Sequence, residues 1–357
     1  MSGNPFPGPR PYTANDRALF FARDAVIKKL VNQIRARPAT TVFGPSGAGK
    51  SSLMQAGVIP LLEESKRTRV VRVDAWPPKE PALPWLVSQL HIDFELGDVP
   101  PDMKALDAFQ QAMDLAWRQS DRPLMIYLDQ LEQLFLGERD GAEVKALCAA
   151  LSWLVDAERS EDVRVVLSLR EDYLGRLRDA TRDRAELSAY GFRVAPLSVG
   201  EIVPAMCRTA RKGNPGQTWD EPDIRLLMLD VRVPGLRATD AAEVQTAFGQ
   251  IVCRALWDEH AAGREVRGAD AEATLRRYLD ATVADLGSLQ GLAEQLLEEY
   301  LVDDEGHRLI LTEKEARLVL GGPGGAILDR LDAARVLRAE EHQGSRYFEL
   351  GHDWLAK

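Results

Sequence analysis

The residues that most constrain this chain are those at 44–51, which read Gly-Pro-Ser-Gly-Ala-Gly-Lys-Ser. An apolar stretch from Thr40 to Phe43 precedes them and predicts a strand, and a helix pattern follows. Glycines let the backbone N–H groups of such a loop close around phosphate oxygens, and the N-terminus of the next helix adds positive potential. The lysine and the final hydroxyl suit the β- and γ-phosphates and Mg²⁺. The pattern therefore predicts a nucleotide-binding P-loop.

The sequence around this loop alternates strand and helix patterns up to about Gly200. Such alternation predicts a parallel sheet with helices on both faces, which is an α/β fold of the P-loop NTPase (ASCE) type. The clearest helix, over 142–157, carries one apolar stripe. The expected strands are 40–43, 69–74, 124–129, 163–169 and 192–195.

The flanking sequence predicts three further parts. Four prolines between Asn4 and Tyr12 exclude a helix there, and apolar spacing then predicts one amphipathic helix over 16–35. Helices are expected after Gly200 at 201–211, 223–229, 243–260 and 271–279. The tail is expected to hold helices 286–301, 312–320 and 327–334, and strands 336–338 and 347–350 around a turn at 343–345.

These patterns predict four segments. They are a Pro-rich segment with a lead-in helix at 1–39, a P-loop NTPase domain at 40–200, a helical lid domain at 201–283 and a winged-helix-like domain at 284–357.

Composition narrows the class of partner. The net charge of −10 offers no broad basic face to nucleic acid or anionic lipid. Cys148, Cys207 and Cys253 are far apart, which favours buried free thiols in a reducing compartment over disulfides or zinc ligands. No apolar run has the length of a membrane span, and the N-terminus lacks a signal pattern. We therefore expect a cytoplasmic protein without a membrane partner.

Beyond the loop, polar residues follow two strands. Asp129 ends the strand 124–129 and is expected to order the water shell of Mg²⁺, although an aspartate there can also be a turn former. Gln130 follows, so Glu132 is the nearest carboxylate that could position an attacking water. The sequence leaves open whether Glu132 faces the γ-phosphate or solvent.

Arg170 ends the next strand and is expected at the same sheet edge as the loop. An arginine there can sense or stabilise the γ-phosphate, and the alternative is a surface salt bridge to Glu171 or Asp172. No Asn-Lys-x-Asp signal for guanine is present, so adenine is favoured.

At these residues the chain resembles the STAND NTPases, the signal-transduction ATPases with numerous domains, which are related to AAA+ proteins. Relative to the bacterial members that open with a Pro-rich segment, Ala22 replaces the usual glycine and Asp24 the usual glutamate. Gly351 replaces an apolar residue. The matching segments are 5–12, 20–24, 44–53, 129–135, 169–177, 250–257 and 348–355.

The resemblance implies residue roles. Phe21 and Arg23 would belong to the adenine pocket, and His352 would contact the β-phosphate of ADP and lock a closed state. The nucleotide-binding residues implied by the loop are Gly44, Pro45, Ser46, Gly47, Ala48, Gly49, Lys50, Ser51 and Ser52, with Ser51 and Asp129 on the metal side.

The resemblance also implies a function. It implies a slow Mg²⁺-dependent ATPase that rests with ADP held between its domains, oligomerises with ATP, and works with a sensor or effector domain or partner. Antiphage defence or stress signalling is the expected setting.

Two alternatives remain, an origin-recognition-like DNA-binding ATPase and a non-hydrolysing scaffold suggested by Gln130. Residues 284–357 hold 8 Lys or Arg against 15 Asp or Glu, which disfavours DNA binding through the tail.

Overall fold

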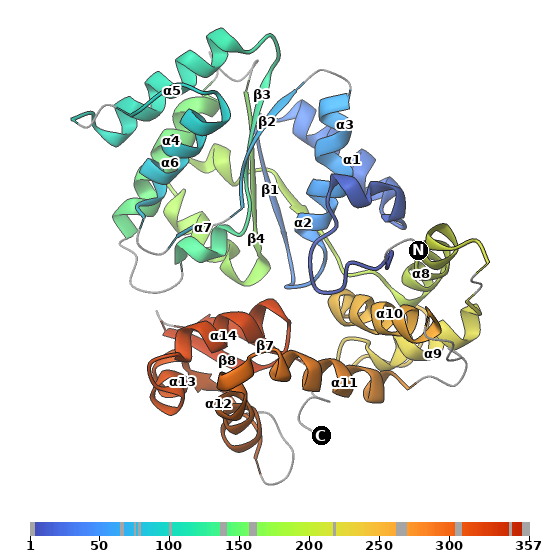
Figure 1. Ribbon diagram of the computed structural model, residues 1–357. Coiled ribbons are helices and arrows are strands. Elements are labelled where there is room, and N and C mark those ends of the chain that lie inside the picture. The colour runs from blue at the N-terminus through green and yellow to red at the C-terminus, as the bar shows by residue number, and fades with distance from the viewer. Residues whose placement is uncertain are drawn as a thin grey trace. The chain divides into compact units, whose positions relative to one another are not determined.

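The computed structural model describes residues 4–64, 68–74, 76–77, 80–99, 102–135, 141–156, 163–216, 219–261, 270–303, 309–342 and 345–351. The chain forms two compact units (Figure 1). The first, here called the P-loop unit, comprises Tyr12–Ala18 and Arg23–Ala195. The second, the helical unit, comprises Met1–Pro11, Leu19–Ala22 and Pro196–Lys357.

The P-loop unit is built on a five-stranded parallel sheet in the order β2-β3-β4-β1-β5. All five predicted strands are confirmed, and their ends lie within two residues of the expected ones. Because β4 lies between β1 and β3, three strand ends become neighbours at the carboxyl edge of the sheet. The strands are β1 (Ala39–Gly44), β2 (Arg69–Val73), β3 (Leu124–Leu128), β4 (Val163–Arg170) and β5 (Gly191–Arg193).

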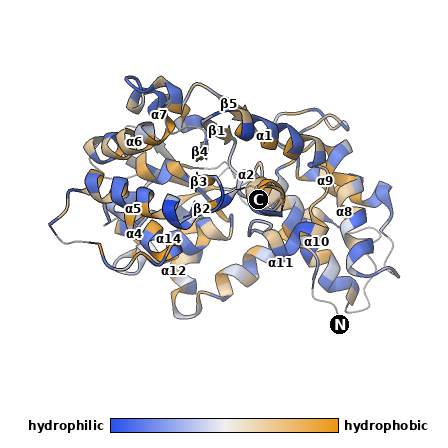
Figure 2. Cartoon of the chain, turned by 90° about the horizontal axis from the view of Figure 1, so that it is seen from above, coloured by the Kyte–Doolittle hydropathy of each residue, from blue (hydrophilic) through white to orange (hydrophobic). Residues whose placement is uncertain are grey.

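Helices cover both faces of this sheet, as Figure 1 shows, which confirms the α/β prediction. Alternate strand residues pack against α4 (Ala82–Asp93), α5 (Ala105–Gln119) and α6 (Gly141–Val155) in one apolar core. The opposite face carries α1 (Asp24–Ala36) and a continuous helical stretch formed by α2 (Lys50–Ser52), η2 (Leu53–Val58) and α3 (Ile59–Glu64). In Figure 2 helices such as α4 and α5 show hydrophilic and hydrophobic residues together, as expected for helices with one buried face.

Short segments complete this unit. The 3₁₀ turn η3 (Leu131–Phe135) follows β3, and η4 (Glu171–Tyr173) with α7 (Leu174–Ala180) follows β4. The 3₁₀ turn η5 (Ala185–Leu187) precedes β5.

The predicted single helix over 16–35 is wrong. The structure has a 3₁₀ segment, η1 (Ala14–Leu19), and then α1, which begins at Asp24. Between them Ala22 has a φ of 65°, in the left-handed region that interrupts a right-handed helix. The resembled family has glycine at this position, which adopts such a φ without steric cost.

The helical unit begins with four helices that confirm the prediction. They enclose an apolar core of their own, and α8 begins with a capping box in which Ser198 and Glu201 bond each other's backbone N–H. The helices are α8 (Val199–Gly213), α9 (Glu221–Asp230), α10 (Thr246–Ala261) and α11 (Ala271–Ala284).

The tail of this unit has a second core and a small antiparallel sheet in the order β6-β8-β7. The helix expected over 286–301 is confirmed as three consecutive segments, and the two-residue strand β6 was not predicted. The expected turn at 343–345 lies mostly outside the described residues. The elements are η6 (Gly287–Leu289), α12 (Gln290–Gln295), η7 (Leu296–Tyr300), β6 (Leu311–Thr312), α13 (Glu313–Leu320), α14 (Gly324–Ala333), β7 (Leu337–His342) and β8 (Ser345–Leu350).

Two expectations from composition can be checked. All three cysteines are free and buried, and burial raises the pKa of the Cys148 and Cys207 thiols to about 11, so they stay protonated. In the part of the chain that the structure describes, every helix is too short or too polar to cross a bilayer.

The Pro-rich segment is fixed to the helical unit by one aromatic side chain. Phe6 is fully buried, its ring stacked on Trp219 at 5.0 Å and edge-on to Trp257 at 6.2 Å. The Arg254 guanidinium donates to the carbonyl oxygens of Phe6 and Pro7, at 3.0 and 3.3 Å. A segment that cannot form a helix is thus held by an aromatic ring and by bonds to its carbonyls.

Phe6→Ala is expected to lower the free energy of unfolding by about 3–5 kcal/mol, because it removes a buried ring between two indoles. Urea denaturation followed by Trp fluorescence measures this. Tyr300→Ala, which truncates a ring that is 37% exposed, is the control and should change stability by about 0.5 kcal/mol or less. Equal effects of the two substitutions would contradict the anchoring role of Phe6.

Candidate active site at the carboxyl edge of the sheet

The loop after β1 needs glycine at three of its positions. Gly47 and Gly49 have φ values of 75° and 89°, which glycine adopts at no steric cost. Gly44 lies beside Val194, which directly follows β5, and an added Cβ would come 2.3 Å from the Val194 carbonyl oxygen. The spacing of glycines in the motif is therefore a requirement of the backbone, and this backbone turns into α2 at Lys50.

Two contacts fix the loop from outside. The Arg23 guanidinium, only 6% exposed, donates to the carbonyl oxygens of Ala48 and Ala195, both at 2.9 Å. The backbone N–H of Tyr12 donates to the Ser52 hydroxyl at 3.1 Å. The Arg23 side chain therefore supports the loop by binding a backbone carbonyl of the loop. Phe21 belongs to the helical unit, where the Arg208 guanidinium lies 5.1 Å from its ring centre.

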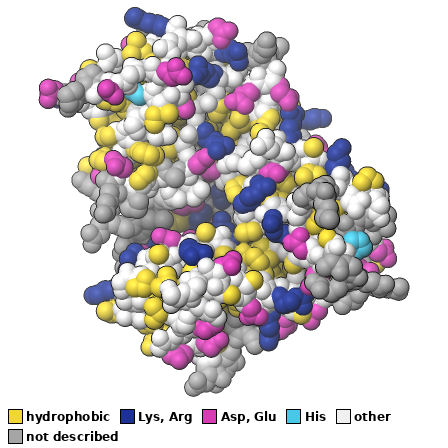
Figure 3. Space-filling view, viewed as in Figure 1, with side chains coloured by type: hydrophobic (Ala, Val, Ile, Leu, Met, Phe, Trp, Pro, Cys, Tyr) yellow, Lys and Arg dark blue, Asp and Glu magenta, His cyan; other side chains and the backbone are white. Residues whose placement is uncertain are grey.

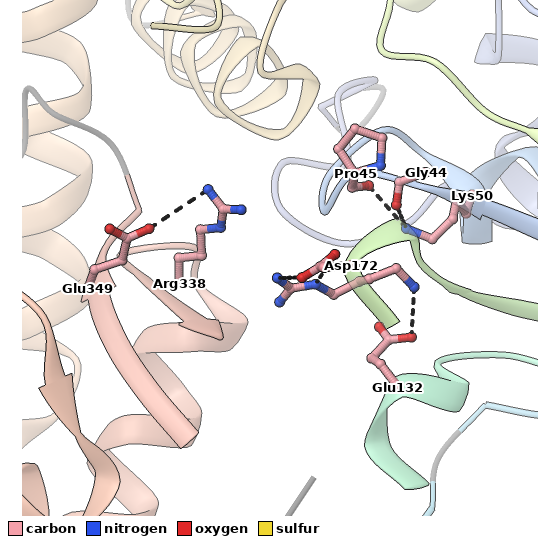
Figure 4. Close-up of polar contacts among 8 residues, drawn as sticks. Gly44, Pro45, Lys50, Glu132, Asp172, Arg338 and Glu349 are labelled. Atoms are coloured by element: carbon pink, nitrogen blue, oxygen red, sulfur yellow. Dashed lines mark hydrogen bonds and ion pairs between the residues drawn. The ribbon is translucent and has the colours of Figure 1, made fainter. Parts of the chain in front are cut away.

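The Lys50 ammonium lies across the start of the loop. It donates to the carbonyl oxygens of Gly44 at 2.9 Å and of Pro45 at 3.0 Å (Figure 4). Burial lowers the pKa of Lys50, while the nearby carboxylates of Glu132 and Asp129 oppose that shift. The structure thus brings Lys50 together with both acids that the sequence proposed for the site.

Asp129 is 1% exposed and directly follows β3. Its Oδ1 accepts a hydrogen bond from the N–H of Gln130 at 3.0 Å, and its backbone carbonyl accepts one from the Trp76 indole at 2.8 Å. Its Oδ2 is buried with no hydrogen-bond partner among the described residues. A buried carboxylate oxygen in that state is costly, and the water shell of a metal ion would satisfy it.

Gln130 is exposed and has a φ of 52°, so the backbone leaves the extended conformation of the strand directly after the acid. Its side-chain oxygen accepts a hydrogen bond from the Gln133 amide at 2.7 Å. The position directly after Asp129, where a second acid could have stood, is thus held by a glutamine whose side chain is bonded to Gln133.

Glu132 is the second acid that the sequence proposed for this site. It lies in η3, and its Oε2 accepts a hydrogen bond from the backbone N–H of Arg170 at 3.2 Å (Figure 4). Burial raises the pKa of Glu132, and the positive charge of Lys50 opposes the shift. Glu132 therefore faces the charged groups of the site.

Arg170 occupies the strand end beside the loop. It is the parallel-register partner of Gly44, and it is 9% exposed. Its guanidinium donates to both carboxylate oxygens of Asp172, one of them at 3.4 Å. The ion pair with Asp172, which the sequence offered as an alternative, therefore forms, with the arginine side chain 11% exposed and the aspartate side chain 44% exposed.

Alternation along the strands explains this convergence. Val73, Leu128 and Leu169 point into the core formed with α4–α6, so the residue that follows each of them points to the face of α2. This rule places three side chains on that face at the carboxyl edge, namely Asp74, Asp129 and Arg170.

Sequence reasoning missed Asp74, although a carboxylate at the end of the expected strand 69–74 was a signal for it, and it named Asp172 only as an alternative partner of Arg170. His352 lies outside the described residues.

The residues present fit a magnesium nucleotide. The loop offers backbone N–H groups and one ammonium for phosphates, and Ser51 in the first turn of α2 offers a hydroxyl. The unsatisfied Oδ2 of Asp129 is of the donor type that Mg²⁺ and its waters prefer. Together they have the donor types that a polyphosphate with a divalent cation requires.

The comparison with protein families agrees with this geometry. A family model described as novel STAND NTPase 1 matches residues 5–356. The chain belongs to this family. The earlier resemblance is thereby confirmed, and membership supports a nucleotide-binding ATPase. No curated protein matches the chain at a significant level.

Solved structures share the fold of this STAND NTPase. The ORC2 protein of Aeropyrum pernix, in ADPNP–ADP complexes, is 13% identical with a TM-score of 0.54, over 93% of this chain and 90% of that one. The ORC1 protein of Aeropyrum pernix in complex with DNA is 15% identical with a TM-score of 0.55, over 94% and 90%. Cdc6p of Pyrobaculum aerophilum is 14% identical with a TM-score of 0.55, over 93% and 90%. At these identities the likeness concerns the fold alone.

Gly44→Ala is expected to destabilise this STAND NTPase by about 1–3 kcal/mol and to weaken nucleotide binding, because the new methyl group forces the loop away from the Val194 carbonyl. Thermal unfolding and titration with a fluorescent ADP measure the two effects. The control is Gly175→Ala, since Gly175 lies in α7 with open space around an added Cβ. A loop variant that is as stable as this control and binds nucleotide normally would contradict the packing argument.

Proposed function

We propose that this chain is an ATP- and ADP-binding switch that holds a magnesium nucleotide in the 44–51 loop and hydrolyses ATP slowly. The observation that carries the proposal is the convergence of Lys50, Asp129 and Glu132 beside that loop. One cation for phosphate, one acid for the metal and one acid for water are the parts that phosphoryl transfer to water requires.

In this proposal Lys50 binds the β- and γ-phosphates, and Ser51 with Asp129 holds Mg²⁺. The metal, when bound, would neutralise charge on the phosphates. Arg170, oriented by its two bonds to Asp172, would sense the γ-phosphate.

Glu132 is proposed to orient the attacking water. Its burial raises its pKa, which makes the carboxylate a better proton acceptor than an exposed glutamate near neutral pH. It does not follow Asp129 directly, and Gln130 occupies that place with its side chain bonded to Gln133. This indirect placement of the base supports slow turnover, as in a switch whose bound nucleotide carries the signal.

Family membership supports the wider setting of the proposal. We extend it to oligomerisation in the ATP state, with a sensor or effector domain or partner, in antiphage defence or stress signalling. The tail, with its helices α12, α13 and α14 and its β6-β8-β7 sheet, supports a winged-helix-like domain in this switch.

DNA binding through that tail is not favoured. The basic side chain of Arg346 on β8 lies 3.5 Å from Asp329 and 3.5 Å from Asp332, both on α14. Pairing within the tail removes positive charge that phosphates would need. In Figure 3 Lys and Arg side chains are interspersed with Asp and Glu over the visible face. The segment 284–357 has an excess of acids, with 15 Asp or Glu against 8 Lys or Arg.

The first test is nucleotide binding by Lys50→Ala. Loss of a buried ammonium that bonds phosphate should weaken Mg-ADP binding by roughly 100-fold, equivalent to about 3 kcal/mol. Fluorescence titration with a labelled ADP measures this, and Lys145→Ala, at an exposed position in α6, is the matched control. Wild-type affinity in Lys50→Ala would refute the loop as the nucleotide site.

The second test separates a slow ATPase from a non-hydrolysing scaffold. Glu132→Gln keeps the shape of the side chain but removes the proton acceptor, so ATP turnover should fall about 100-fold or more while ATP affinity changes little. Phosphate release over hours, with Lys50→Ala as the blank, measures turnover. If wild type and Glu132→Gln both release phosphate at the blank rate, the chain is a scaffold.

A further inference from the structure

Asp74 lies beside the metal-side acid, Asp129, on the neighbouring strand. In the parallel register of β2 and β3, Val73 is the partner of Leu128, and the Asp129 N–H donates to the Val73 carbonyl at 2.8 Å. Asp74 directly follows Val73, and Asp129 directly follows Leu128. Alternation sends both side chains to the face of α2, so the two carboxylates leave adjacent strands at the same level.

Each of these carboxylates has one oxygen engaged and one buried oxygen left over. Arg72 holds Oδ2 of Asp74 at 2.6 Å, and the Gln130 N–H holds Oδ1 of Asp129 at 3.0 Å. The other oxygens, Oδ1 of Asp74 and Oδ2 of Asp129, are buried and have no hydrogen-bond partner among the described residues. A buried oxygen of this kind has lost its hydrogen bonds to water and has gained none within the protein, which is destabilising.

The two negative charges also act on each other. Burial raises the pKa of Asp74, Arg72 lowers it, and the charge of Asp129 raises it further. Two like charges with unsatisfied oxygens favour a divalent cation or its water shell.

We propose that Asp74 is a second metal-side carboxylate, which together with Asp129 holds the water shell of the Mg²⁺ that enters with the nucleotide. The inference rests on the proposed nucleotide-binding function. Magnesium sites commonly combine one or two carboxylates with substrate phosphates and several retained waters, and the pair supplies those carboxylates. Asp74 would thus set the affinity for the metal without touching the nucleotide.

The test is Asp74→Asn, read as the Mg²⁺ dependence of labelled ADP binding. The Mg²⁺ concentration for half-maximal tightening should rise about 10-fold, as for other outer ligands of metals, while ADP affinity in EDTA stays within about twofold of wild type. A merely structural role would weaken binding equally with and without Mg²⁺. Asparagine has the shape of aspartate, and the side chain is 36% exposed, so the variant should fold.

Asp93→Asn is the matched control. Asp93 is also a partly buried acid, and its pKa is raised by burial and lowered by the charge of Arg69. Arg69, however, begins β2 at the opposite edge of the sheet. An unchanged Mg²⁺ requirement in Asp74→Asn, or an equal shift in Asp93→Asn, overturns the inference. Those results leave the proposed function intact, since that function fails only if the wild type binds no nucleotide or Lys50→Ala binds it normally.

Discussion

The parallel pairing of β4 with both β1 and β3 is the constraint on which the site depends. It makes Gly44 and Arg170 register partners and sets Asp129 one strand further along the same edge. Alternation then turns Arg170 and Asp129 toward the face on which α2 begins. The loop proposed to bind phosphate thereby has an acid and a cation from two other strands beside it.

The site gathers charges that the protein alone stabilises poorly. Burial lowers the pKa of Lys50 and raises that of Glu132, and Asp129 has a buried oxygen without a partner in the described part of the chain. Phosphates and a divalent cation would supply the missing partners. The free energy of unfolding should therefore increase when the site is occupied, because a ligand that binds only the folded state stabilises that state by mass action. This coupling suits a protein whose state is set by its bound nucleotide.

The loop, the five strands and the four helices of the helical unit could be predicted, because each depends on a local pattern of glycines or apolar spacing. The break at Ala22 could not, since alanine at a left-handed φ leaves no signal in apolar periodicity. The sequence placed Arg170 at the right edge but left open whether it senses the γ-phosphate or forms a surface salt bridge. The end of the 69–74 strand marks Asp74 in the sequence, but its place beside Asp129 depends on the pairing of β2 with β3, which only the topology reveals.

The most direct measurement is a crystal structure of the chain grown with ADP and Mg²⁺. The account predicts the β-phosphate within hydrogen-bond distance of the 44–51 backbone N–H groups and of Lys50 Nζ, and a magnesium ion between Ser51 and the waters held by Asp129. Phosphates bound elsewhere, or a loop filled by a neighbouring side chain at saturating nucleotide, would contradict it.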